Sequence, residues 1–98
     1  MSSPIARILH FSFETAEDLN LWVMKYETET SELAKEAIQR TLVKTDETSL
    51  VICNIYHNEE DANNVLERLS KWSGTVKAAR TWESFNLTGE VVFSEPKY

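Results

Sequence analysis

The chain has 98 residues, of which 42% are hydrophobic and 27% charged, and its formal net charge is −6. A chain of this length buries only about 60–65% of its unfolded surface and cannot stabilise two cores, so we expect a single domain over residues 1–98. Lysines and arginines are scattered singly instead of forming a basic stripe, and this disfavours a nucleic-acid-binding protein.

The single cysteine, Cys53, excludes an internal disulfide and a cysteine-based zinc site. It lies in SLVICNIY, where we expect it to be buried as a small hydrophobic residue. The sequence has no signal-peptide pattern, and no apolar run approaches the roughly 20 residues of a membrane span. These features predict a cytoplasmic protein without a membrane segment.

The first predicted element is a strand over residues 5–13, IARILHFSF. Side chains alternate between the two faces of a strand. One side therefore carries Ile5, Arg7, Leu9, Phe11 and Phe13, and the other carries Ala6, Ile8, His10 and Ser12. Both sides are largely apolar, and the second includes a histidine.

A helix is predicted after this strand. Thr15 and Asp18 have the spacing of a capping box. The residues that then recur at helical spacing are Leu19, Trp22, Val23 and Tyr26. A short second helical segment is predicted at about 31–37, where the apolar repeat is Leu33, Ala34, Ala37 and Ile38.

A hairpin follows, with strands near 38–45 and 48–57 on either side of the turn TDET. The next helix begins after Asn58 with three acidic residues in its first turn, which suit the helix dipole, and it ends at Gly74. A strand is predicted within residues 75–87. A short fifth strand, 89–93, is predicted after a turn at Thr88 and Gly89.

This order predicts a ferredoxin-like α+β fold. Two split β-α-β units give a four-stranded antiparallel sheet with both helices on one face. Two helices cover only one face, yet the third strand is also apolar on both sides. One side reads Val51, Cys53 and Ile55, and the other reads Leu50, Ile52, Asn54 and Tyr56. A large apolar sheet face is unfavourable in water, so we expect a homodimer that pairs sheet to sheet.

Three stretches, RILHFSF, LVKTDETSLVICNIYHNEEDANNVLERL and TWESFNLTGEVVF, together cover most of the chain. In this arrangement the chain resembles the dimeric α+β barrel superfamily, which includes antibiotic-biosynthesis-monooxygenase-like proteins. The resemblance implies a dimer, and GEVVF is similar to the extra C-terminal strand that often reaches across to the partner in such dimers.

Family enzymes that oxidise without metal or flavin typically place an Asn, a Trp and a His around an apolar cavity. The histidine commonly comes from the helix after the third strand. Here that helix reads DANNVLERLSKW and has no histidine. None of the candidate residues of this chain matches the family site residue by residue, which puts that type of catalysis in doubt.

Two polar residues on the strands are the main candidates for a site. His10 either acts as an acid or base beside a substrate, or it makes a structural hydrogen bond at a dimer interface. Asn54 either binds a ligand or pairs across the dimer. The predicted ligand-binding residues are His10, Asn54, Tyr56, Trp22 and Trp82, with His10 as the candidate catalytic residue. The helical stripes that carry Trp22 and Trp72 favour the core over a pocket for both, and Trp82 lines one or the other face of the last strand. Arg7 and Arg80 either bind a carboxylate or have surface and salt-bridge roles.

Three functions follow from these patterns. The first is a dimer that binds a small or long-chain apolar ligand, in a cavity between sheet and helices or near the dimer seam. The second is a cofactor-free monooxygenase or isomerase, and the third is a structural or regulatory dimer without a small-molecule site. No cofactor and no metal site are predicted: the two histidines are far apart in sequence, and NEED and TDET lack the spacing of a calcium loop.

Overall fold

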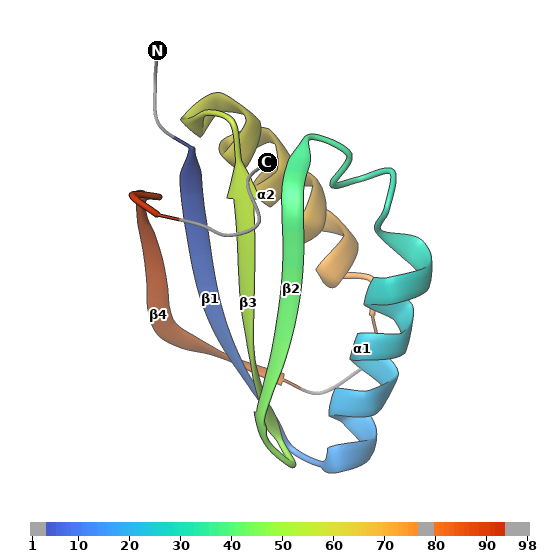
Figure 1. Ribbon diagram of the computed structural model, residues 1–98. Coiled ribbons are helices and arrows are strands. Elements are labelled where there is room, and N and C mark those ends of the chain that lie inside the picture. The colour runs from blue at the N-terminus through green and yellow to red at the C-terminus, as the bar shows by residue number, and fades with distance from the viewer. Residues whose placement is uncertain (1–3, 77–79, 94–98) are drawn as a thin grey trace.

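The computed structural model describes residues 4–76 and 80–93, with the backbone alone for 80–86. Its elements, in chain order, are β1 (Ile5–Phe13), α1 (Ala16–Glu29), β2 (Ala37–Asp46), β3 (Ser49–Tyr56), α2 (Glu59–Ser73) and β4 (Arg80–Glu90). The strands form an antiparallel sheet in the order β2-β3-β1-β4, and both helices lie on one of its faces (Figure 1). This is the ferredoxin-like α+β arrangement that the sequence predicts.

The helix ends lie where local sequence signals place them. The Thr15 hydroxyl accepts a hydrogen bond of 3.0 Å from the backbone N–H of Asp18 at the start of α1. The Asn58 side chain does the same for Asp61 at 2.8 Å, and α2 ends at Gly74. Both N-caps satisfy a backbone donor that has no partner within the helix.

The second helical segment predicted at about 31–37 is wrong. Residues 31–36 form turns, and Ala37 already begins β2. The guanidinium of Arg68 holds this segment against α2, because it donates to the carbonyl of Leu33 and pairs with Glu36 at 2.6 Å. The apolar repeat of the segment thus reflects contact with α2 and entry into the sheet.

The predicted fifth strand over 89–93 is also wrong. Thr88 and Gly89 form no turn: β4 continues through both to Glu90, which pairs with Ile5. Residues 91–93 belong to no strand, although the backbone N–H of Val91 donates to the carbonyl of Pro4 at 2.8 Å. Continued pairing with β1 satisfies the backbone groups that a turn would have left free.

The ladder between β1 and β4 has one irregularity. Leu9 pairs with Asn86, and Phe11 pairs with Trp82. Three residues of β4, 83–85, therefore stand opposite His10 alone, and β4 is curved along its length (Figure 1). Extra residues in one strand of a pair bend that strand in this way.

The core lies between the sheet and the helices. Its buried residues include Leu9, Phe11 and Phe13 of β1, Leu50 and Ile52 of β3, Leu19, Trp22 and Tyr26 of α1, and Trp72 of α2. The opposite face of the sheet is open and still carries Ile8, Val51 and Cys53, all half-buried. Val43 and Leu87 on the flanking strands are 48% and 52% exposed. None of the described helices combines the length and the apolar character that a membrane span requires.

Candidate functional site

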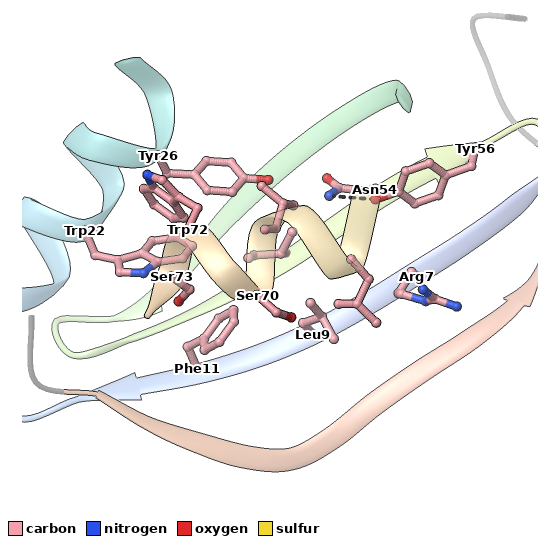
Figure 2. A pocket seen from close by; sticks show the side chains of 13 residues that line it. Arg7, Leu9, Phe11, Trp22, Tyr26, Asn54, Tyr56, Ser70, Trp72 and Ser73 are labelled. Carbon is pink, nitrogen blue, oxygen red and sulfur yellow. Dashed lines mark hydrogen bonds between the residues drawn. The ribbon is translucent and has the colours of Figure 1, made fainter. Parts of the chain in front are cut away.

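A cavity lies between the sheet and the two helices (Figure 2). It is lined by Arg7, Leu9, Phe11, Trp22, Tyr26, Ile52, Asn54, Tyr56, Leu66, Leu69, Ser70, Trp72 and Ser73. About 450 Å³ is free of atoms when its opening is included, but the centre of a water-sized sphere can move through only about 30 Å³. That space holds one or two waters, so a larger molecule requires lining side chains to move.

Aromatic rings form one end of this cavity. Trp22 stacks on Tyr26 with ring centroids 5.0 Å apart and planes 18° apart. Trp72 meets Trp22 edge-on at 5.5 Å, and Phe11 lies 5.4 Å from Trp22. Stacked and edge-on pairs are the favoured arrangements of aromatic side chains, so this end is a well-packed apolar wall.

The other end is polar. The Asn54 amide donates a hydrogen bond of 3.2 Å to the Tyr56 hydroxyl, and both side chains are buried (Figure 2). Burial raises the pKa of Tyr56, because the phenolate loses its hydration there. The Tyr56 phenol therefore stays protonated at neutral pH.

Three buried polar atoms on the cavity wall have no hydrogen-bond partner among the described residues. They are Trp22 Nε1, Tyr26 Oη and Asn54 Oδ1. The Tyr26 hydroxyl and the Asn54 amide point toward each other across the cavity (Figure 2). An unsatisfied buried donor or acceptor costs about 1–3 kcal/mol. A water or a polar group of a ligand between them would remove that cost.

Arg7 enters the cavity from β1 and is only 8% exposed. Its guanidinium donates to the Thr88 hydroxyl at 3.1 Å, to the carbonyl of Ala62 at 3.1 Å and to Asn63 Oδ1 at 3.0 Å. All three acceptors are neutral. These bonds join β1, β4 and the first turn of α2, and they place a positive charge at the polar end of the cavity.

Three of the residues predicted as ligand-binding lie together on this cavity: Trp22, Asn54 and Tyr56. His10 does not, because it points to the open face, opposite to its neighbours Leu9 and Phe11. The backbone of Trp82 pairs with Phe11, while its side chain and that of Arg80 are outside the described part of the chain. Within that part, no three His, Cys, Asp or Glu side chains are grouped as a metal site would require.

The helical stripes that carry Trp22, Tyr26 and Trp72 predict burial in the core, and nothing in the sequence singles out Arg40. Tyr26 and Trp72 are in the core, and they also line the cavity. Their helical spacing predicts burial but not which buried side chains border empty space. The signal for Arg40 is its position in β2 directly opposite Asn54, which requires the register of the hairpin.

No protein-family model matches the chain, and a search of curated proteins found no significant match. Several solved structures are similar at low sequence identity. A dimeric ferredoxin-like protein from an uncultured marine organism is 17% identical with a TM-score of 0.68, over 99% of this chain and 95% of that protein. SnoaB, a cofactor-independent oxygenase from Streptomyces nogalater, is 12% identical with a TM-score of 0.65, over 98% and 100%.

A protein from Nitrosomonas europaea, described as a candidate antibiotic biosynthesis monooxygenase, is 12% identical with a TM-score of 0.64. The match covers 95% of this chain and 94% of that protein. These matches confirm the predicted ferredoxin-like fold, and at such identities they establish a shared fold and not a shared activity. The chain has the ferredoxin-like fold, which it shares with these solved structures.

Proposed function

We propose that this protein binds a small, largely apolar ligand in the cavity between the sheet and the helices. The observation that carries the proposal is that Trp22 Nε1, Tyr26 Oη and Asn54 Oδ1, all buried on the cavity wall, have no hydrogen-bond partner among the residues that the structure describes. Buried polar groups are nearly always hydrogen-bonded, and ligand pockets combine apolar walls with a few such groups. A ligand with one or two polar atoms fits this pattern.

The size of the cavity favours a small ligand over a long-chain one. Its 30 Å³ of usable space must grow before even one aromatic ring can enter. Leu66 and Leu69 of α2 border the cavity and are only half-buried. Their side chains can turn toward solvent at little cost in buried apolar surface, so we expect the cavity to open on the α2 side.

Titration with N-phenyl-1-naphthylamine, an uncharged dye that fluoresces in apolar sites, tests the proposal. We expect saturable binding of one dye per chain. Leu66→Phe fills the cavity and should weaken binding about tenfold or more, because overpacking removes the space the dye needs. Met24→Phe, which adds the same ring at a position 54% exposed on α1, is the matched control and should leave binding unchanged. Equal binding to both variants would place the dye elsewhere and contradict the proposal.

A cofactor-free oxygenase or isomerase is the second candidate. Asn54 and Trp22 at an apolar cavity favour it, as does the similarity to a cofactor-independent oxygenase. Such reactions begin with removal of a proton from the substrate by a base. The described residues that line the cavity include no histidine or carboxylate, and the raised pKa of Tyr56 makes its phenol a poor base. The residues at hand therefore support binding more directly than catalysis.

We also propose that the protein is a homodimer through the open sheet face. Ile8, Val51 and Cys53 lie in the middle of that face, with Val43 and Leu87 beside them. Val92 and Phe93, which follow β4, are 90% and 77% exposed. A second copy of the chain would cover apolar surface that is unfavourable in water. His10 would then lie within the interface.

A further inference from the structure

We propose that the ligand is an aromatic carboxylate. Arg40 of β2 binds its charged group, and Arg7 adds to the positive potential around it. The inference rests on the proposed ligand-binding function and adds the class of ligand.

The two arginines and Asn54 form a row across the sheet. Arg7 of β1 and Arg40 of β2 both pair with Asn54 of β3, from opposite sides. Residues that pair directly across strands share a face, and this is the face that the helices cover. Neighbouring strands are about 4.8 Å apart, so the Cα atoms of the two arginines are about 10 Å apart on either side of Asn54.

Neither arginine is paired with a described carboxylate. The ion pairs among the described residues are Lys25–Glu29, Arg68–Glu36 and Lys71–Glu67. Within the described residues Arg7 donates to neutral acceptors alone, and so does Arg40, which donates to the Thr30 hydroxyl. A buried charge is costly unless an opposite charge accompanies it. In a chain with a net charge of −6, two unpaired cations beside one cavity are a feature that an anionic ligand would explain.

Arg40 does not line the cavity itself but lies against Tyr26, which does. Its guanidinium lies over the ring of Tyr26, 4.6 Å from the centroid, and Arg40 Nε is buried and has no hydrogen-bond partner in the described part of the chain. Tyr26 borders both the cavity and an outer groove of about 340 Å³, which Glu27, Arg40 and Leu42 also line. Glu27 is exposed and makes no ion pair with Arg40.

The side chains of Arg40, Tyr26 and Asn54 can all donate hydrogen bonds. Tyr26 points its hydroxyl toward Asn54 (Figure 2). Arg40 is the cross-strand neighbour of Asn54 on β2. A half-turn of the Asn54 amide keeps its bond to Tyr56, since the phenol then donates to Oδ1, and turns Nδ2 toward the cavity. Tyr26 O–H and Asn54 N–H would then donate to one acceptor between them, beside the Arg40 guanidinium that lies over the Tyr26 ring. A carboxylate suits this set, and the wall of Phe11, Trp22 and Trp72 suits an aromatic body.

The test compares 1-naphthoate with 1-naphthamide, which has the same shape and no charge. Each is titrated into the full chain while the indole N–H resonances are followed by ¹H–¹⁵N NMR. We expect naphthoate to bind at least about tenfold more tightly than naphthamide. Arg40→Gln should reduce that preference to about twofold or less, because it weakens naphthoate binding more than naphthamide binding. Arg40→Lys, which keeps the charge, should restore part of it.

Lys44→Gln is the matched control, since it removes a positive charge from an exposed position of the same strand and should not alter the preference. Equal binding of naphthoate and naphthamide to the natural chain would overturn the anion inference and leave the ligand-binding function standing. Binding of neither compound would contradict both. A preference for naphthoate that survives in Arg40→Gln would overturn the role of Arg40 even where cavity binding is retained.

Discussion

The indole of Trp72 donates a hydrogen bond of 3.1 Å to Glu29 Oε1 and so links α2 to the last turn of α1. This bond holds the pKa of Glu29 below its ordinary value of 4.5 against the opposing effect of desolvation, and the nearby charge of Lys25 lowers the pKa further. Because the folded chain lowers this pKa, the ionised carboxylate contributes stability above pH 4.5. That contribution is lost as the pH falls through the lowered value.

Because of this hydrogen bond, we expect the titration of the Glu29 carboxyl to be visible in the NMR signal of the Trp72 indole. The ¹⁵N resonance of its Nε1–H should shift as Glu29 takes up a proton, with a midpoint below pH 4.5. In Glu29→Gln the resonance should not titrate in this range, while Glu27→Gln, an exposed change on the same helix, should leave the shift intact. A midpoint at or above pH 4.5 in the natural chain would show that the hydrogen bond does not hold the carboxylate in solution.

Single residues of the site were predictable only in part. Trp22, Asn54 and Tyr56 could be found because a large aromatic or an amide within an apolar pattern must be buried. For His10, strand alternation divides the residues into two sides but does not say which side the helices cover. In the sequence Arg40 cannot be told from an ordinary surface cation, because its proposed role in ligand binding depends on its cross-strand position opposite Asn54.

At the scale of the elements, the two N-caps are strong determinants of where the helices begin. Asn58→Ala removes the acceptor for the backbone N–H of Asp61. We expect a loss of about 1 kcal/mol in the free energy of unfolding, measured by urea denaturation. Asn64→Ala makes the same chemical change at an exposed position in the middle of α2 and should not destabilise the protein. Equal losses in the two variants would argue against the cap.

Element prediction succeeded where a short-range signal decides the outcome. The caps at Thr15 and Asn58, the hairpin turn and the end at Gly74 depend on side chains a few residues apart. The prediction of elements failed where residues far away in the sequence determine the local structure. Residues 31–36 form turns against α2 through Arg68, and Thr88 and Gly89 remain extended through their pairing with β1.

For the molecule as a whole, the apolar open face leads to a prediction about mass in solution. Sedimentation at micromolar concentration should give twice the 11.3 kDa mass of the chain. Val51→Lys places a charge at the centre of the open face and should yield a folded monomer. Met24→Lys, at a 54% exposed position on α1, should remain dimeric. A mass of 11.3 kDa for the natural chain would contradict the proposed dimer.

The fold class and the two-sided apolar sheet could be derived from the order and alternation of the strands. The cavity could not, because its volume depends on how Trp22, Tyr26 and Trp72 fit together. Small differences in packing decide whether such rings fill a core or leave space, and residue patterns do not resolve them.

The irregular pairing opposite His10 restricts how β4 can change in length. Three residues of β4 face one residue of β1, an excess of two. Loss of two residues there preserves the parity of the strand, so Thr88 stays beside Arg7 and Leu87 stays on the open face. Loss of one residue exchanges the two faces beyond the bulge: Leu87 leaves the open face, and Gly89, which has no side-chain acceptor, comes opposite Arg7 in place of Thr88. Insertions and deletions in this strand of related chains should therefore come in pairs.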